Sequence, residues 1–491
     1  MAGARQHIRF LLNGEEVTTG DVRPDETLLD YLRLRRTLSG TKEGCAEGDC
    51  GACTVLVGRL SDGELIYEGV NACIRFLASV DGCHVVTVEH LKRADGTLHP
   101  VQQAMVDHHG SQCGFCTPGF VMGLYALWMR KPTPSEQDIE TALQGNLCRC
   151  TGYEPIVKAA KAISGYGAMK NEPLVAERAE VTSILKGWKD GSRVEIGDAG
   201  ERFIIPGSLD DFADAYEANP DATIVAGSTD VGLWVTKFMR EIAPVIFIGG
   251  LEELRQFGKS DGAITIGAGV SYTGAREILA AAMPAFGDLI DRIGGDQVRN
   301  MGTIGGNIAN GSPIGDTPPP LIALGAELTL RKGSRRRTMP LEEFFIDYGK
   351  QDRQPGEFVE SVTVPLPAKG AHFSAHKITK RRDEDITAAL GAYYVELAGD
   401  GTVAAVRIAY GGMAATPKRA RSAEAMLIGR PWTAENIEAA MDALSSDFTP
   451  ISDMRASADY RMLVARNLLK RFFIETSGTK KPVTVKRYEA A

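Results

Sequence analysis

The sequence predicts an α+β chain of several domains, and three of its features support this prediction. Its 491 residues correspond to roughly three domains at about 150 residues per domain. Strand-like runs prevail in residues 1–90 and again after residue 196, whereas residues 91–165 have the spacing of consecutive helices. All nine cysteines lie in the first third of the chain, so we expect its distinctive chemistry there.

Composition narrows the function classes. Hydrophobic residues make up 44% of the chain and charged residues 24%, which is ordinary for a soluble globular protein. A net charge of −8 argues against nucleic-acid binding. No apolar run approaches the roughly 18 residues of a membrane helix, and the N-terminus lacks the apolar segment of a signal peptide. We therefore expect a cytoplasmic protein that does not bind membranes.

Residues 1–90 are expected to form a small α/β domain. Asn13-Gly14 is a strong hairpin-turn signal between two short strand-like runs. Leu28, Tyr31 and Leu32 have helical spacing within residues 27–36. The expected strands are 7–12, 16–18, 54–57 and 85–88.

Residues 91–165 are expected to be helical. Pro100, Pro118 and Pro155 each stand where the first turn of a helix would begin. Short connections between consecutive helices predict a compact four-helix bundle. The expected helices are 100–109, 118–130, 135–143 and 155–164.

The rest of the chain divides into three further parts and a tail. Residues 166–195 are polar without clear periodicity and are expected to be a linker, partly ordered against its neighbours. From 196 to 370 glycine-punctuated strands alternate with helices, and from 371 to 475 a strand-rich stretch precedes two long helical runs. The tail 476–491 is expected to be mobile, and the basic run 331–337 to be a solvated turn.

The first set of cysteines is Cys45, Cys50, Cys53 and Cys73. A C-x4-C-x2-C run with one distant partner has the spacing of a plant-type [2Fe–2S] site. Gly44, Gly48 and Gly51 would let the backbone approach the cluster and its sulfides. Zinc is the main alternative, although zinc sites prefer two C-x2-C pairs; unligated cysteines are a further alternative.

The second set is Cys113, Cys116, Cys148 and Cys150. On spacing alone these thiolates could hold zinc as well as a second [2Fe–2S] cluster. The two pairs precede the second and fourth expected helices, so two helix N-termini would point at the site and stabilise a negatively charged cluster. Cys83 remains, and we expect it to be a partly buried free thiol without a role.

Around these eight cysteines the sequence resembles the molybdenum hydroxylases of the xanthine dehydrogenase type, and the resemblance covers nearly the whole chain. GCAEGDCGACTV and NACI resemble the family's ferredoxin-type module, while QCGFCTPGFVM and NLCRCTGYEPIV resemble its helical cluster module. The resemblance implies a β-grasp [2Fe–2S] ferredoxin domain over 1–90, followed by a four-helix-bundle [2Fe–2S] domain over 91–165.

Glycine-rich turns stand in the middle of the chain, in residues 224–231 and 297–307, and a further turn follows at 312–316. There is no G-x-G-x-x-G after a first strand and no P-loop, which excludes those nucleotide sites. Turns of this composition present N–H and hydroxyl donors that suit a diphosphate. Taken alone, however, each is more often an ordinary turn.

As a pair, the turns resemble the flavin domain of the xanthine dehydrogenase and carbon monoxide dehydrogenase families. The resemblance implies an α+β FAD-binding domain of the vanillyl-alcohol-oxidase/CO-dehydrogenase flavoprotein type over 196–370, with a C-terminal α/β subdomain over 371–475. Residues 224–231 and 303–307 would wrap the FAD diphosphate, and Asp316 would bind the ribityl or ribose region. The residues that it assigns to FAD are Ile224, Val225, Ala226, Gly227, Ser228, Thr229, Asp230, Val231, Ile293, Thr303, Ile304, Gly305, Gly306, Asn307, Asp316, Val359 and Lys377.

Three of these positions would lie near the isoalloxazine. Ile293 and Val359 match positions that pack on the flavin, although one of these is often aromatic in the family and Ile293 departs from that. Lys377 matches a lysine near the ring. The charged loop 378–386 is either a solvated charge run or the family loop that flanks the flavin and influences the approach of nicotinamide.

In long members of the family a molybdopterin domain follows the flavin domain, whereas this chain ends at residue 491. The resemblance implies the small subunit of a two-chain xanthine dehydrogenase, with molybdopterin–molybdenum on a large partner chain and a heterotetramer of two such units. Electrons would pass from the partner through both clusters to FAD and NAD as hypoxanthine and xanthine are oxidised to urate, with no catalytic residue for hydroxylation in this chain. The alternatives are a related hydroxylase of aldehydes or other N-heterocycles, and a non-enzymatic redox sensor or assembly protein.

Overall fold

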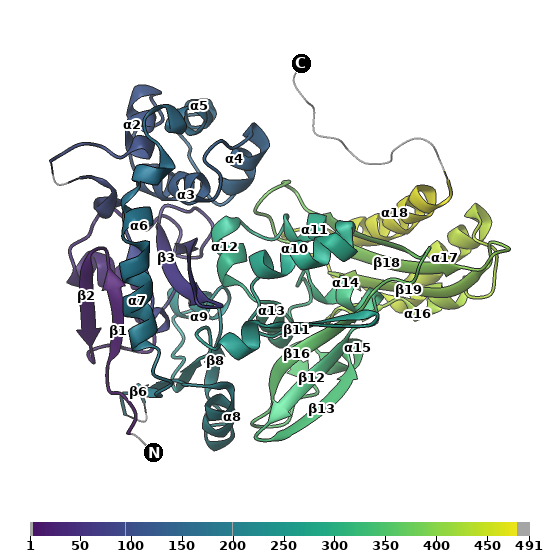
Figure 1. Ribbon diagram of the computed structural model, residues 1–491. Coiled ribbons are helices and arrows are strands. Elements are labelled where there is room, and N and C mark those ends of the chain that lie inside the picture. Colours follow the sequence, from purple (N-terminus) through teal and green to yellow (C-terminus); the bar gives the residue numbers. More distant parts are fainter. Residues whose placement is uncertain (1–2, 94, 199, 479–491) are drawn as a thin grey trace.

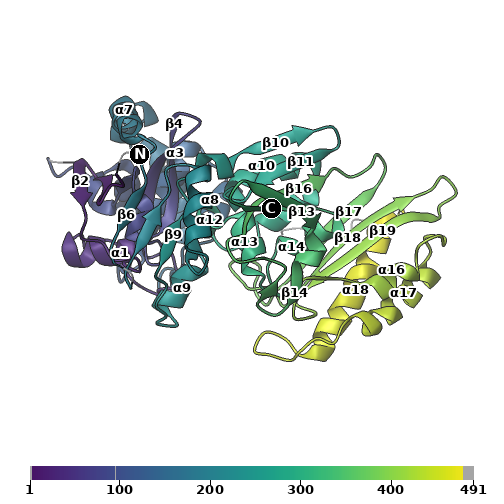
Figure 2. The ribbon, with the colours of Figure 1, turned by 90° about the horizontal axis from the view of Figure 1, so that it is seen from below.

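The computed structural model describes residues 3–93, 95–198 and 200–478. Its parts follow one another in space much as they do along the chain (Figure 1). Two small domains from the N-terminal third lie at one side, a larger α+β domain occupies the middle, and a sheet covered by helices forms the other side (Figure 2). Among these residues, no helix is both long and apolar enough to cross a membrane.

The first domain is a five-stranded sheet in the order β2-β1-β5-β3-β4. β1 and β5 are parallel, and the other neighbours are antiparallel. Asn13 takes the positive φ of 56° that the predicted turn requires, whereas β4 was not predicted. The elements are β1 (Ile8–Leu12), β2 (Glu15–Thr19), α1 (Leu28–Asp30, continued by a π-helical turn at Tyr31–Arg35), β3 (Thr54–Ser61), β4 (Glu64–Asn71) and β5 (His84–Val86).

The second domain is a bundle of four helices, each within two residues of its expected bounds: α2 (Pro100–Asp107), α3 (Thr117–Arg130), α4 (Glu136–Ala142) and α5 (Glu154–Ala162). The three prolines occupy the first turns of α2, α3 and α5, as their missing N–H permits. α3 lies at the centre, and every residue from Gly119 to Trp128 is buried. The predicted bundle is therefore confirmed.

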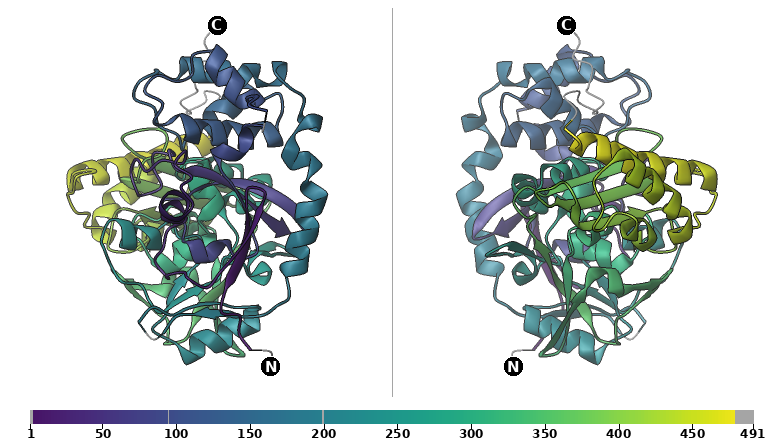
Figure 3. Two further views of the ribbon diagram at one scale, coloured as in Figure 1. Left: turned by 90° about the vertical axis from the view of Figure 1, so that its left-hand side faces the viewer. Right: turned by 90° about the vertical axis from the view of Figure 1, so that its right-hand side faces the viewer.

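Residues 166–195 form more regular structure than a linker. They include α6 (Pro173–Ala176) and α7 (Arg178–Trp188), which run down the outside of the first domain from the helical bundle to the middle domain (Figure 3). Glu172 is 3% exposed and accepts hydrogen bonds from His99 Nε2 at 2.7 Å and from the Tyr125 hydroxyl. Because a buried carboxylate must be paired, these bonds anchor the segment to the bundle.

The described residues of the middle domain form two main sheets and one short two-stranded pair. A small sheet has the order β6-β7-β9-β8, in which β7, β9 and β8 are parallel. A larger antiparallel sheet has the order β10-β11-β16-β12-β13. The strands are β6 (Val194–Ile196), β7 (Phe203–Ile205), β8 (Thr223–Val225), β9 (Val245–Phe247), β10 (Phe257–Ser260), β11 (Ala263–Gly267), β12 (Glu327–Lys332), β13 (Arg335–Pro340), the short pair β14 (Phe345–Asp347) and β15 (Lys350–Gln351), and β16 (Phe358–Pro365).

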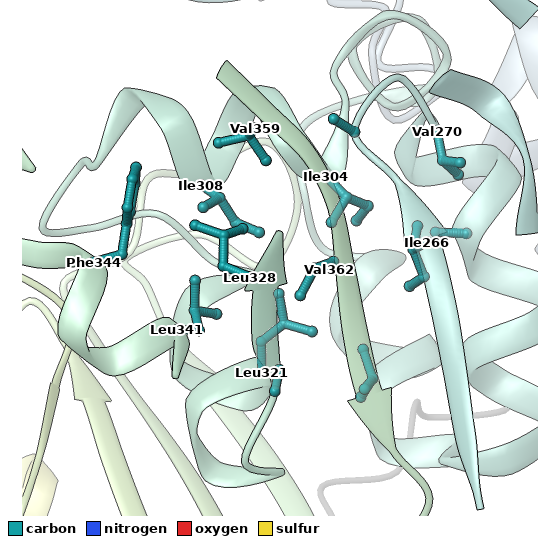
Figure 4. Close-up of a cluster of buried hydrophobic side chains, with 14 of the residues drawn as sticks. Ile266, Val270, Ile304, Ile308, Leu321, Leu328, Leu341, Phe344, Val359 and Val362 are labelled. Carbon is teal, nitrogen blue, oxygen red and sulfur yellow. The ribbon is translucent and has the colours of Figure 1, made fainter. Parts of the chain in front are cut away.

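The core of this domain lies between the larger sheet and several of its helices (Figure 4). Ile304 and Ile308 pack with Val359 and Val362 of β16, and Ile304 is fully buried. This packing fixes the glycine-rich turn before α13 against the sheet. The helices are α8 (Leu209–Ala218), α9 (Val231–Thr236), α10 (Tyr272–Ala282), α11 (Pro284–Ile290), α12 (Asp296–Met301), α13 (Ile304–Asn310), α14 (Pro318–Ala323) and α15 (Leu341–Phe344).

The last domain is a four-stranded antiparallel sheet in the order β17-β18-β19-β20, packed on three helices. Its elements are β17 (His372–Ile378), β18 (Ala389–Leu397), β19 (Val403–Gly411), β20 (Lys418–Arg419), α16 (Arg421–Ala425), α17 (Ala434–Asp447) and α18 (Ala458–Thr476). The predicted strands and the two long helices are present. Most of the predicted tail, from residue 479 onward, lies outside the described residues.

The basic run 331–337 is not the solvated turn that we expected. It forms the facing ends of β12 and β13, and only Gly333 and Ser334 make the turn. Arg331 is 4% exposed and pairs with Asp210 at 2.5 Å. Acidic residues distant in sequence thus allow the run to be part of a sheet, which its composition alone did not indicate.

Candidate functional site

The first cysteine set is gathered in the long loop before β3 and just after β4. Cys53 and Cys73 are 1% and 2% exposed, and their Sγ atoms lie 3.3 Å apart. The Cys45 sulfur accepts hydrogen bonds from the backbone N–H groups of Asp49 and Cys50, both at 3.4 Å. Amide donors of this kind suit a sulfur that carries negative charge.

Glycines shape this loop as the sequence predicts. Gly48 and Gly51 have φ angles of +80° and +68°, which side chains with a Cβ rarely adopt. At Gly44 a Cβ would lie 2.8 Å from the Cys50 sulfur. The loop can therefore wrap a small group tightly only with glycine at these positions.

The thiols of the first set have pKa values shifted in opposite directions. Hydrogen bonds from the thiols of Cys50 and Cys73 hold the pKa of Cys45 well below its ordinary value. The contact with Cys45 and burial raise the pKa of Cys50. Crowded thiols of this kind are poised to lose their protons to metal, because a bound cation stabilises every thiolate at once.

The second cysteine set lies at the surface of the helical bundle. Cys113 and Cys150 are exposed, whereas Cys148 is 7% exposed. Cys116 immediately precedes α3. Burial and the Cys148 thiol raise the pKa of Cys116 to about 12. Burial raises the pKa of Cys148, but hydrogen bonds from Thr151, including one at 3.2 Å to its sulfur, outweigh this and lower it.

The thiols contact one another within each set. Within the described residues, no three His, Cys, Asp or Glu side chains converge closely enough to hold one metal ion. In the first set Cys45 contacts both Cys50 and Cys73, and Cys73 also contacts Cys53. In the second set Cys113 contacts Cys150, and Cys116 contacts Cys148. Each set therefore brings together the four thiolates that a [2Fe–2S] cluster takes, two on each iron.

The two cysteine loops contact each other through their backbones. The N–H of Leu147 donates to the carbonyl oxygen of Cys50 at 3.0 Å, and Leu147 directly precedes Cys148. Asn146 Nδ2 donates to the carbonyl oxygen of Gly51 at 3.3 Å. One hydrogen bond therefore joins Cys50 of the first set to Leu147, the residue next to Cys148 of the second set.

The two predicted glycine turns of the middle domain lie against each other. A Cβ on Gly227 would be 1.6 Å from the carbonyl oxygen of Met301. No hydrogen bond is formed by the backbone N–H groups of residues 227–230, within the described part of the chain, and Ser228 has a φ of 62°. Consecutive free N–H groups in such a turn make an anion-binding concavity, so the first turn fits a diphosphate.

The second turn leads directly into α13. The N–H groups of Ile304 and Gly305 donate to the carbonyls of Val270 and Ala268, and those of Gly306 and Asn307 donate to the hydroxyl and carbonyl oxygens of Thr303. Two of these bonds thus tie the turn to the segment after β11, and the other two close the first turn of the helix. The assignment of residues 303–307 to FAD stays a prediction.

Two charged residues predicted to bind FAD meet each other. Lys377 Nζ donates to Asp316 at 2.7 Å and to the carbonyl oxygen of Arg292 at 2.9 Å. Thr387 donates to the other carboxylate oxygen of Asp316. Ile293 follows Arg292 directly, and both Ile293 and Val359 are 7% exposed and belong to the hydrophobic core of this domain.

The loop 378–386 is packed in part: Lys380, Arg381 and Arg382 are exposed, whereas Glu384 is buried. The guanidinium of Arg292 donates to Lys377, Thr379 and Arg382, and Gln144 of the helical domain donates to Asp383 at 2.9 Å. Glu384 is 6% exposed, has a φ of 47° and leaves one buried carboxyl oxygen unpartnered. Burial, reinforced by the nearby Asp49, raises the pKa of Glu384 to about 9.

Comparison with known proteins assigns these parts. Residues 10–77 match the 2Fe-2S iron-sulfur cluster binding domain, and residues 87–161 match the [2Fe-2S] binding domain. Residues 197–367 match the FAD binding domain in molybdopterin dehydrogenase, and residues 374–476 match the CO dehydrogenase flavoprotein C-terminal domain. The chain therefore has two [2Fe–2S] domains and an FAD-binding domain.

A chain of the carbon monoxide dehydrogenase from Hydrogenophaga pseudoflava is 31% identical, with a TM-score of 0.52, over 55% of this chain and 94% of that chain. The 491-residue chain therefore belongs to the molybdenum hydroxylase family. This molybdenum hydroxylase chain is also 34% identical to xanthine dehydrogenase of Emericella nidulans, over 95% of its own 491 residues. It is 32% identical to aldehyde oxidase 1 of Cavia porcellus, over 98% of its own residues. It spans 38% and 41% of the length of these two relatives.

Sequence reasoning missed several residues of this molybdenum hydroxylase chain that connect its sites. Gln297, Asn146 and Arg292 make the hydrogen bonds between domains and loops, and Glu384 is buried at a domain boundary. Each is a polar residue whose partners are distant in sequence. Local spacing therefore carried no signal for them.

Proposed function

We propose that the chain is the iron–sulfur and flavin subunit of a two-chain xanthine dehydrogenase. A large partner chain holds the molybdenum cofactor, and electrons from the oxidation of hypoxanthine and xanthine to urate pass through the second cluster, the first cluster and FAD to NAD+. Two such units form a heterotetramer in the cytoplasm. Similarity to xanthine dehydrogenases over 95% and 94% of the chain supports the substrate, and nine free cysteines suit a reducing compartment.

One observation carries the proposed order: the first cysteine loop contacts both the loop that bears Cys148 and the flavin domain. On one side, Cys50 accepts the hydrogen bond from Leu147. On the other side, the Thr236 hydroxyl of α9 donates to the carbonyl oxygen of Ala46 at 2.6 Å, and Ala46 follows Cys45. Since α9 begins where the first glycine turn ends, the loop contacts both neighbours of the proposed relay.

The exposed second set supports entry of electrons from a partner chain. Cys113 and Cys150 lie at the surface, and Phe115 and Tyr153 beside them are 48% and 40% exposed. Large exposed hydrophobic side chains around a chemically active site suit burial against another protein. We place the contact with the molybdenum-binding chain here.

The residues of this chain hold and tune the groups that transfer electrons. When bound, the clusters supply one-electron transfer and FAD couples it to hydride transfer with NAD. The eight thiolates of the two sets ligate iron, and the glycines of the first loop admit backbone N–H donors to its sulfur atoms. The N–H groups of residues 227–230 would bind the FAD diphosphate, Asp316 would bind the ribityl or ribose region, and Lys377, which donates to Asp316, would lie near the isoalloxazine.

A second candidate is the same subunit of a hydroxylase that acts on aldehydes or other N-heterocycles. The chain is 32% identical to aldehyde oxidase 1 of Cavia porcellus and equally 32% identical to xanthine dehydrogenase/oxidase of Gallus gallus. In either case the substrate would bind on the partner chain, so the test requires the assembled enzyme.

Coexpression with the large chain tests both candidates. We expect the purified complex to contain about four irons and one FAD per small chain and to reduce NAD+ with xanthine and hypoxanthine. Turnover of an aldehyde or of quinoline without purine activity would select the second candidate. A complex without iron or FAD would contradict both.

A further inference from the structure

Three domains meet at one buried amide, that of Gln297 in α12. Gln297 Nε2 donates to the Thr54 hydroxyl of the ferredoxin-type domain and to Asn146 Oδ1 of the helical domain, both at 2.9 Å. These three side chains are 2%, 1% and 2% exposed, respectively for Gln297, Thr54 and Asn146. Among the described residues of the flavin domain, no other side chain hydrogen-bonds to both cluster domains.

Both partners of Gln297 converge on a single carbonyl oxygen. Gly51 O accepts hydrogen bonds from the Thr54 hydroxyl at 2.6 Å and from Asn146 Nδ2 at 3.3 Å. Gly51 lies between Cys50 and Cys53, and Asn146 lies two residues before Cys148. The Gln297 amide is therefore linked to the first cysteine loop through Thr54, which bonds to Gly51 O. It is linked to the second cysteine loop through Asn146.

Glycines bring the three backbones together at this point. A Cβ on Gly51 would lie 2.0 Å from the carbonyl oxygen of Gly145, one on Gly145 would lie 2.0 Å from Gln297 Oε1, and one on Gly295 would lie 2.3 Å from the Gly145 Cα. These close approaches surround the buried Gln297 amide with backbone, so removing its donor would leave a buried acceptor unpaired.

We propose that Gln297 is a positioning residue for electron transfer, which fixes the flavin domain against both cysteine loops and so sets the separation of the redox groups. The inference rests on the proposed electron path. It assigns to the Gln297 amide the relative placement of the two clusters and FAD. The other side-chain contacts between the described residues of these domains each reach one cluster domain only. Thr236 and Asn300 bond to the ferredoxin-type domain, at Ala46 O and Gly69 O, and Asp296 and Asp383 bond to the helical domain, at Arg130 and Gln144.

Removing the two N–H donors of Gln297 tests the proposal. Gln297→Met keeps the volume of the side chain but leaves Asn146 Oδ1 buried without its donor. Gln297→Glu places a carboxylate against two acceptors at neutral pH. The assembled enzyme would be photoreduced by a flash with 5-deazariboflavin, and the redistribution of electrons between iron–sulfur centres and flavin would be followed by absorbance. This probe needs neither purine nor NAD, so its outcome is independent of the proposed substrate and acceptor.

We expect redistribution to slow by roughly tenfold in Gln297→Met, because small misplacements of reacting groups are costly, with iron and FAD contents unchanged. The dipolar broadening between the EPR signals of the two dithionite-reduced clusters should change as well. Gln297→Glu should recover part of the rate on acidification, because a neutral carboxyl donates one hydrogen bond.

Asn300→Ala is the matched control, since it removes a buried hydrogen bond of the same helix to the same neighbouring domain. We expect it to keep the parental rate. The proposal is overturned if Gln297→Met transfers electrons at the parental rate, or if Asn300→Ala slows transfer as much. It is also overturned if Gln297→Met loses iron or FAD, because the side chain would then hold a cofactor in place of setting the domain position.

Discussion

The backbone N–H of Leu147 donates to the carbonyl oxygen of Cys50 at 3.0 Å, and this bond joins the two cysteine loops. It involves no side chain, and the Leu147 side chain is 39% exposed. The contact therefore depends on the paths of the two loops and not on the residue at position 147. It places the neighbour of Cys148 against a residue of the first set, which is the arrangement that a relay between two clusters needs.

The Cys148→Ser variant should distinguish reduction of FAD by purine, which needs the second cluster, from reduction of FAD by NADH, which does not. The serine hydroxyl is a poor substitute for a thiolate ligand, so we expect the second cluster to be lost or impaired and iron to fall from about four to about two per chain. Purine should then no longer reduce FAD in the assembled enzyme, whereas NADH should still reduce it, as stopped-flow absorbance measures. Cys83→Ser is the control, because Cys83 lies outside both sets and its pKa is raised by burial. Equal loss of both reactions in Cys148→Ser would contradict the order.

Gly51→Ala should disrupt the first cysteine loop. The φ of +68° strains alanine by about 1 kcal/mol, and its Cβ would also meet the carbonyl oxygen of Gly145 at 2.0 Å. Gly82→Ala carries the same backbone strain, since Gly82 has a φ of +71° with nothing near its Cβ position. Thermal unfolding and iron analysis should show a large loss of stability and iron in Gly51→Ala and only a small loss of stability in Gly82→Ala. Equal effects would mean that the close approach to Gly145 is unimportant.

Lys377→Met should weaken FAD binding. It leaves Asp316 as a buried carboxylate without its cation, and breaking a buried pair in this way costs about 3–5 kcal/mol. We expect purified Lys377→Met to contain less FAD than the parent and to unfold at a lower temperature, while its iron content is retained. Lys161→Met is the control, since it breaks the exposed pair with Glu136, whose contribution is about 0–1 kcal/mol. Full FAD occupancy in Lys377→Met would contradict a role of this pair at the flavin.

Glu384 gives the chain a pH-dependent stability of known sign. The pKa of its carboxyl is raised from the ordinary 4.5 to about 9, first by burial and then by Asp49, against the opposing charges of Arg381 and Arg299. The unfolded chain therefore releases this proton at lower pH than the folded chain does. The resulting stability is complete below pH 4.5 and is lost as the pH rises to about 9.

Glu384→Gln removes this dependence because glutamine does not titrate. We expect the melting temperature of the variant relative to the parent to increase steadily from pH 5 to pH 9, as scanning fluorimetry would measure. A difference that stayed constant over this range would show that Glu384 is ionised in the folded protein at neutral pH.

Much of the fold could be predicted from local patterns. The helices of the bundle are marked by prolines in their first turns, and the Asn13-Gly14 turn sets the first hairpin. The cysteine spacing grouped the eight thiols into the two sets that the structure brings together. These features depend on residues close in sequence, where periodicity and turn chemistry act.

The remaining features depend on contacts between distant segments. Residues 166–195 are anchored to the bundle where Glu172 bonds to His99 and Tyr125, and the N–H groups of residues 304–307 donate to Val270, Ala268 and Thr303. Gln297 carries no local signal, since its partners lie 243 and 151 residues away. Partners of this kind are decided by tertiary packing, which a single sequence does not display.

Metal and cofactor analysis of the purified chain, together with EPR after reduction by dithionite, tests the central claim most directly. We expect iron and acid-labile sulfide in equal amounts, one FAD per chain, and two distinct [2Fe–2S] EPR signals of equal intensity. Zinc at the thiolates, or a single iron–sulfur signal in fully loaded protein, would contradict a two-cluster relay.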